Sequence, residues 1–162
     1  MKTAALSSVE SATPAKVLRR FRVVFNAVRT HFRHMEKQAG LGGAQVWALS
    51  LIKTKPGIGM GEIAASMEIH QSTASNLIKV LLNKELIRAE KSPHDRRNVQ
   101  LTILPAGSRL LKKVPGPFEG VLPQALANLS GETLQRLDED LRQLIVLLNA
   151  DEAAEETPLA QL

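Results

Sequence analysis

The chain has 162 residues, a net charge of +5 and a hydrophobic content of 44%, which predict one folded domain, with room for a helical extension. It has no cysteine, and this excludes disulfides, thiolate metal sites and cysteine redox chemistry. We find neither a secretory signal nor a run of about 20 apolar residues that would span a membrane, so we expect a cytoplasmic protein.

The charge is divided unevenly along the chain. Residues 1–113 carry 19 Lys and Arg against 7 Asp and Glu, a net charge of +12, whereas residues 114–162 carry 2 against 9, a net charge of −7. A basic body with an acidic C-terminal segment favours a polyanion as the partner of the body. The alternative is a solvated surface whose charge is simply uneven.

The first predicted element is a long helix over residues 14–38, after a small, polar N-terminus (1–13) that we expect to be flexible. Its apolar residues recur at spacings of three and four and form one seam. The seam consists of Leu18, Phe21, Phe25, Val28, Phe32 and Met35. Three glycines within residues 39–43 break this helix, and a second helix is predicted over 44–55, before Pro56 and Gly57.

Two short helices come next, over residues 60–67 and 71–84, with a turn at 68–70 between them. Gly59 is the expected N-cap of the first, with Glu62 three residues on. The period then changes to that of strands, and residues 87–91 and 99–103 predict a hairpin whose polar tip spans 92–98.

Proline and leucine patterns organise the rest of the chain. Pro105 suits the first turn of a helix, and Pro115, Pro117 and Pro123 must break or bend the chain after that helix. Ser130 is the expected N-cap of a last helix over 131–150, whose leucines again recur at spacings of three and four. We expect residues 151–162 to form a flexible acidic tail.

Two short helices, a tight turn and a hairpin form a winged helix-turn-helix, in which the N-terminal residues of the second helix enter the major groove of DNA. Gln and Asn pair with adenine, Ser and Thr bond bases or phosphates, and Lys neutralises phosphate. These residues are also ordinary helix caps, which is the simpler reading when they are taken alone. The predicted groove residues are Gln71, Ser72, Thr73, Ser75, Asn76 and Lys79.

The tip of the predicted hairpin carries Arg96 and Arg97 beside Asp95. A narrow minor groove attracts an inserted arginine, and a neighbouring carboxylate holds a guanidinium in a fixed pose. A solvated charged turn is the alternative. The position of the tip, just after the candidate groove helix, favours a second DNA contact at Arg96 and Arg97, with Asp95 orienting the wing.

Residues 41–111 resemble the MarR family, through the stretches LGGAQVWALSLIKTKPG, MGEIAASMEIHQSTASNLIKVL and SPHDRRNVQLTILPAGSRLL. The resemblance implies a homodimer in which the N- and C-terminal helices of both subunits interlock. The chain departs from the family pattern at three positions. Asn76 replaces a frequent arginine, Glu85 replaces a glycine that would relieve a left-handed turn, and Leu104 replaces a capping threonine.

The resemblance also implies a pocket for a small aromatic acid near His31, Met35 and Trp47, although core packing is the favoured interpretation of Trp47. His31 and His34 could share a metal ion, but a third ligand would have to come from elsewhere. We expect no cofactor and no enzymatic activity, because no nucleophile and base form a recognisable motif. Gly57, Gly59 and Gly61 lack the preceding strand of a nucleotide-binding loop.

The sequence therefore predicts a mainly α protein with a small β-hairpin wing. Its winged helix-turn-helix (41–112) would lie between dimerisation helices at 14–40 and 113–150. The expected function is that of a dimeric, sequence-specific repressor whose binding to a pseudopalindromic operator is modulated by an aromatic acid. A metal-responsive regulator and a winged-helix module that binds nucleic acid or protein without sequence preference are the alternatives.

Overall fold

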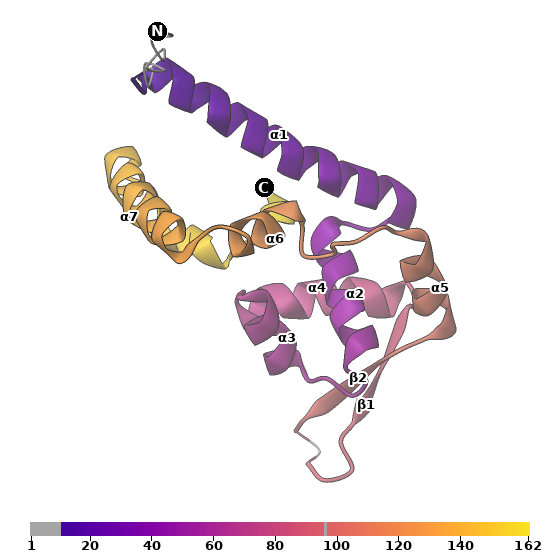
Figure 1. The fold of residues 1–162 in the computed structure, drawn as a ribbon. Helices are drawn as coiled ribbons and strands as arrows, with labels where there is room; N and C mark the ends of the chain where they lie inside the picture. The colour runs from indigo at the N-terminus through magenta and orange to yellow at the C-terminus, as the bar shows by residue number, and fades with distance from the viewer. Residues whose placement is uncertain (1–10, 96) are drawn as a thin grey trace, which may run out of the picture.

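The structure, a computed structural model, describes residues 11–95 and 97–162, so most of the predicted flexible N-terminus (1–10) and Arg96 lie outside the described residues. One long helix lies above a small helical body from which a hairpin protrudes (Figure 1). The elements are α1 (Pro14–Ala39), α2 (Gly43–Thr54), α3 (Met60–Met67), α4 (Gln71–Asn83), β1 (Ile87–Lys91), β2 (Val99–Ile103), α5 (Pro105–Lys113), α6 (Val121–Ala127) and α7 (Gly131–Leu148).

Local signals place the helix ends where the sequence predicts them. α1 starts after Thr13, whose hydroxyl accepts the Lys16 N–H, and ends at Gly40 in the left-handed conformation with φ 65°. The Ser130 hydroxyl accepts the Thr133 N–H at 3.2 Å and caps α7 as predicted. Such caps satisfy N–H groups that have no partner within the helix.

The core is centred on α2, which packs against α1, α4, α5 and β2. Val46, Ala48, Leu49 and Ile52 are fully buried there. Only the C-terminal part of α1 joins this core, through Phe32 and Met35. Burial of this apolar surface, at about 25 cal/mol per Å², is the main force that holds the helical body together.

The hairpin has the predicted strands, with an antiparallel register from Ile87 opposite Ile103 to Lys91 opposite Val99. Ile58 adds a bridge to Leu101 that the sequence did not predict. The Gly57 N–H donates to the Leu101 carbonyl at 2.8 Å, and the Leu101 N–H donates to the Ile58 carbonyl at 3.0 Å. A single paired residue leaves no periodic pattern in a sequence, so this anchor of the hairpin could not be foreseen.

Two departures from the family pattern have the local geometry expected of them. Glu85 is left-handed, with φ 54°, in the turn between α4 and β1. Leu104 is the N-cap of α5 and makes no side-chain hydrogen bond to the helix.

Pro123, which was predicted to break or bend the chain, lies in the first turn of the helix α6 instead. A first-turn N–H has no partner within a helix, so proline is tolerated there.

The expectation of a loose tail at 151–162 is wrong. Two 3-10 turns, η1 (Glu152–Glu156) and η2 (Leu159–Gln161), continue the chain after α7, and η2 packs against α1 and α2. Pro158 is buried, and Ala160 packs against the hydrophobic core. The acidic composition of the segment masks this short apolar run in the sequence. In the structure the run packs against α1 and α2.

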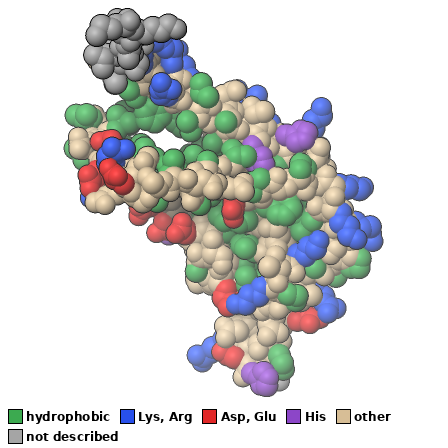
Figure 2. Space-filling view, viewed as in Figure 1, with side chains coloured by type: hydrophobic (Ala, Val, Ile, Leu, Met, Phe, Trp, Pro, Cys, Tyr) green, Lys and Arg blue, Asp and Glu red, His purple; other side chains and the backbone are tan. Residues whose placement is uncertain are grey.

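The first half of α1 and the whole of α7 keep apolar side chains exposed. Phe25 is 65% exposed and Val146 is 70% exposed, and no residue of α7 is buried. Hydrophobic side chains gather around the hollow between these two helices (Figure 2). Among the described residues no helix is both long and apolar enough to cross a membrane.

Candidate nucleic-acid interface

The helix α4 has two faces of opposite character. Ala74, Leu77, Ile78 and Leu81 are buried against the body. Of the predicted groove residues, Thr73 is half-buried and the others are exposed. Residues three and four apart share one face of a helix, so burial of the apolar set turns the polar set outward. The exposed set consists of Gln71, Ser72, Ser75, Asn76 and Lys79.

The turn between α3 and α4 sets the start of this helix. Glu68 closes α3 in the left-handed conformation, with φ 53°, and Ile69 is buried. His70 is the N-cap of α4, but its side chain caps no N–H of the helix. The first N–H groups of α4 therefore receive no side-chain acceptor from the N-cap residue. The positive end of the α4 helix dipole faces outward at this point.

Asp95 holds the backbone of the wing tip. Its carboxylate accepts the backbone N–H of Arg97 at 2.9 Å and the side-chain amide of Asn98 at 3.2 Å. The Asp95 carbonyl accepts the Asn98 N–H at 2.9 Å. These contacts are to the Arg97 backbone and the Asn98 amide, so Asp95 orients the loop, while Arg96 lies outside the described residues. Asn98 is the partner that the sequence reasoning missed, and the Asp-x-x-Asn spacing was its signal.

A groove joins the two predicted contact regions. It has a volume of about 710 Å³ and lies between the first turn of α3, the start of α4 and the wing. Gln71 from α4 and Arg97 from the wing both line it, together with Asn98 and Gln100. The fold thus brings residues 26 positions apart in the chain to the same surface.

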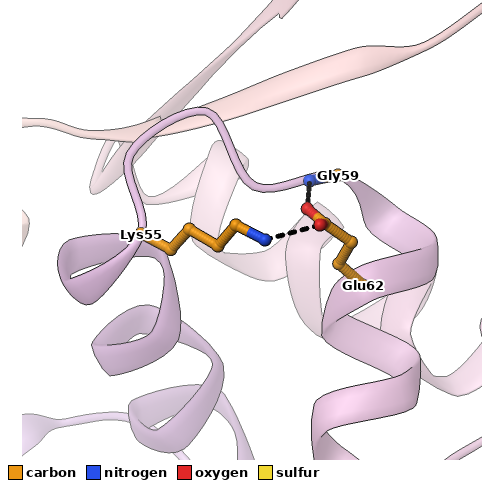
Figure 3. A network of polar contacts seen from close by, with 3 residues as sticks. All are labelled: Lys55, Gly59 and Glu62. Atoms are coloured by element: carbon orange, nitrogen blue, oxygen red, sulfur yellow. Dashed lines mark hydrogen bonds and ion pairs between the residues drawn. The ribbon is translucent and has the colours of Figure 1, made fainter.

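A polar network fixes the loop between α2 and α3, on the α3 side of this groove (Figure 3). The Lys55 ammonium donates to the Glu62 carboxylate at 2.6 Å, and the Gly59 N–H donates to the same carboxylate at 3.1 Å. Both hydrogen bonds lower the pKa of the Glu62 carboxyl, and the one from Lys55 has the larger effect. The predicted pairing of Gly59 with Glu62 is confirmed, and Lys55 extends it to the end of α2.

The residues predicted to bind an aromatic acid occupy the boundary between α1 and α2. Met35 is fully buried in the core, while His31 and Trp47 are half-buried. The His31 ring nitrogen Nε2 lies 2.8 Å from the Pro117 carbonyl, which is its hydrogen-bond partner. Within residues 11–95 and 97–162, no group of three His, Asp or Glu side chains could hold a metal ion.

Comparison with known proteins adds independent information. Residues 39–98 match the model of the MarR family. The relative YdgG of Bacillus subtilis (strain 168), described as an uncharacterized HTH-type transcriptional regulator, is 26% identical over 110 residues, which are 67% of this chain and 68% of that protein. The matched family and this relative are transcriptional regulators and not enzymes.

Two solved structures share the fold at low sequence identity. A MepR-like protein complexed with pseudoligands has a TM-score of 0.56 and 14% identity, and the match covers 87% of this chain and all (100%) of that chain. A mutant MarR from E. coli complexed with operator DNA has a TM-score of 0.54 and 15% identity, over 83% and 99% of the two chains. These matches show that the chain has the winged helix-turn-helix fold of these proteins, and residues 39–98 match the MarR family in sequence.

Proposed function

We propose that this regulator is a homodimeric repressor that reads a pseudopalindromic DNA operator through α4 and the wing. The observation that carries the proposal is the groove lined by both Gln71 and Arg97, beside the exposed polar face of α4. A helix presented in this way enters a major groove, while the wing meets the neighbouring minor groove or its phosphates.

Each side chain has a role that follows from its chemistry. Gln71 and Asn76 would pair with adenine edges, Ser72 and Ser75 would bond bases or phosphates, and Lys79 would neutralise a phosphate. Thr73 is half-buried, so we assign it to the phosphate side of α4. Arg96 and Arg97 would enter the minor groove. The E. coli MarR structure with the same fold is a complex with operator DNA, which supports this partner.

The homodimer follows from the apolar surfaces that one chain leaves exposed. The seams of α1 and α7 stay largely exposed within the described chain, and their exposed residues include Leu18, Phe25, Leu141 and Leu148. A second copy with the same two helices would cover them. A two-fold dimer implies half-sites about 10 bp apart.

The effector part of the proposal rests on His31 and Trp47, which are half-buried on either side of the α1–α2 boundary. The MepR-like structure with pseudoligands supports a ligand-responsive fold of this shape. An aromatic acid would weaken DNA binding only if it prefers the geometry that does not bind DNA. Trp47 is the only tryptophan, so quenching of its fluorescence by benzoate would report binding directly.

The test of the whole proposal is selection of bound duplexes from a random pool by the purified full chain. We expect enrichment of an inverted repeat with half-sites about one helical turn apart. Binding to all duplexes alike, lost at raised salt, would instead assign the chain to non-specific winged-helix modules. Binding that requires added zinc and disappears with a chelator would favour the metal-responsive alternative.

The dimer has a separate test by analytical ultracentrifugation. Leu141→Glu places a charge on the exposed seam of α7 and should shift the wild-type dimer to a monomer. Gln143→Glu adds the same charge at an exposed polar position of the same helix and should leave the dimer intact. A wild-type chain that sediments as a monomer would refute the dimer.

A further inference from the structure

We propose that the acidic C-terminal segment 151–162 is an autoinhibitory strap that competes with DNA phosphate for the start of α4. This inference rests on the proposed function, because it concerns regulation of the same DNA-binding surface. Its physical basis is a contact between two parts of the chain that are far apart in sequence. His70 Nδ1, at the N-cap of α4, lies 2.5 Å from the Glu156 carboxylate oxygen Oε2 of the strap.

The strap is seated by apolar contacts at its far end. α7 ends at Asn149 in the left-handed conformation, which turns the chain back, and the Asp151 carboxylate then accepts the Ala153 N–H at 3.0 Å. Further on, Ala160 lies against α2 so closely that a Cβ added at Gly43 would be 2.9 Å from the Ala160 Cβ. The seat keeps the acidic part of the strap beside the body.

The acidic part of the strap reaches the turn between α3 and α4. Glu155 and Glu156 line a cavity of about 410 Å³ together with Ala64, Ala65, Glu68 and Ile69. Residues 151–156 contain four acidic side chains and no basic one. A strongly negative segment therefore lies beside the first residues of the helix that we assign to DNA.

The start of α4 is also where a phosphate would bind. The helix dipole and the N–H groups of the first turn favour an anion, and the side chain of His70 caps none of them. A phosphate and the Glu156 carboxylate would compete for His70, and the remaining acids of the strap would repel the DNA backbone within about 10 Å. The strap must therefore be displaced before DNA can settle on the start of α4.

The contact is weak enough to be displaced. The His70 side chain is 62% exposed and that of Glu156 is 40% exposed, and contacts between side chains this exposed contribute little to stability. Glu68 and Glu155 share the cavity with Glu156, and repulsion among the three carboxylates opposes the attraction of His70. The strap is thus held mainly by its apolar seat and only loosely by its charged end.

The experiment measures affinity for the selected duplex by fluorescence anisotropy at about 50 mM and about 200 mM salt. Glu156→Gln should bind DNA about two- to fivefold more tightly than wild type at the lower salt, which is the scale of one exposed ion pair. The triple change Glu152→Gln, Glu155→Gln and Glu156→Gln should bind more tightly still. Both gains should shrink at the higher salt, because the repulsion is screened.

The matched control is Glu139→Gln on α7, which removes the same charge from the exposed surface and should change affinity much less. Adding His70→Gln to Glu156→Gln should abolish most of the gain, because His70 is the group released for the phosphate. Thermal unfolding should show that all these variants keep the wild-type fold.

The outcomes separate this inference from the proposed function. If wild type binds a selected duplex and the glutamine variants bind it equally or more weakly, the strap does not compete with DNA, and only the inference fails. If wild type selects no duplex but the triple variant does, the inference is supported in its strongest form. If neither protein binds DNA, the proposed function and the strap fail together.

Discussion

The carboxylate of Asp95 accepts the backbone N–H of Arg97 at 2.9 Å, so an acidic residue fixes the backbone at the arginine two positions on. An acidic side chain at the tip of the wing would be expected to repel a polyanion, and this arrangement explains why Asp95 need not do so. The carboxylate is turned toward the loop, where its charge is partly satisfied by N–H donors. The arginine side chain remains exposed at the surface.

Replacing Asp95 tests this orienting role. Asp95→Ala should weaken binding to the selected duplex by about 1 kcal/mol, because the Arg97 N–H loses its acceptor and the loop is less ordered before binding. Asp95→Asn keeps one acceptor oxygen and should lose less. Isothermal titration would compare the two, and equal losses would show that the negative charge, rather than the acceptor, is what matters.

Removal of the Arg97 side chain should lower the affinity for DNA and leave the fold unchanged. Arg97→Ala should weaken DNA binding by about 1–2 kcal/mol. It should also reduce the slope of log affinity against log salt concentration by about one, because one fewer counterion is released from the DNA. Arg109→Ala removes the same charge from the exposed surface of α5 and serves as the control in anisotropy titrations. Similar losses in both variants would indicate a general effect of charge and no wing contact.

Asn76 is expected to read a base. Asn76→Ala should lower affinity for the selected site by about 1–3 kcal/mol, with the loss concentrated at one base position. The control is Asn83→Ala, a change of the same type at the exposed C-terminal end of the same helix. Binding to duplexes with single base changes would locate the position, and a loss spread evenly over the site would contradict base reading by Asn76.

Glu85 should be a point of weakness in the fold. It has φ 54°, a conformation that costs a residue with a Cβ about 1 kcal/mol, so Glu85→Gly should raise the free energy of unfolding by about 0.5–1 kcal/mol. Lys84→Gly, at φ −89°, relieves no strain and should lower it by a similar amount. Urea unfolding measures both, and a loss of stability in Glu85→Gly would refute the argument.

Gly107 marks a close approach between α5 and the turn before the hairpin. A Cβ at this position would lie 2.4 Å from the Leu86 carbonyl oxygen and 2.9 Å from the Ile103 side chain. Gly107→Ala should therefore lower the free energy of unfolding by about 2–3 kcal/mol, measured by urea unfolding. Gly131→Ala, in the first turn of α7 with no atom within 4 Å of the new Cβ, should change it little. Equal effects of the two alanines would contradict the predicted clash.

Local rules were enough to predict much of the candidate site. The two faces of α4 follow from the spacing of Ala74, Leu77 and Leu81, and the strand limits follow from the change of period at Ile87. The Gly59 cap was also predictable, whereas the left-handed turn at Glu85 was implied only by the resemblance to the MarR family. The locally predicted features depend on residues within one or two turns of chain, where the backbone has few alternatives.

Other features of the site depended on contacts that no local rule describes. The sequence indicated that Asp95 orients the wing, but the choice between the Arg97 backbone and a guanidinium depends on how the loop closes. The shared groove of Gln71 and Arg97 exists because the hairpin folds back beside α3 and α4. Closure of this kind requires the whole body to be in place.

The sequence by itself determined most of the elements and the exposed polar face of α4, because side-chain spacing and backbone preference act over a few residues. Only the tertiary structure decided which distant segments meet. Ile58 pairs with Leu101, Gly107 lies against Leu86, and Glu156 reaches His70. These contacts are selected by packing and burial across the whole chain, so a segment that looks like a loose acidic tail lies against the start of α4.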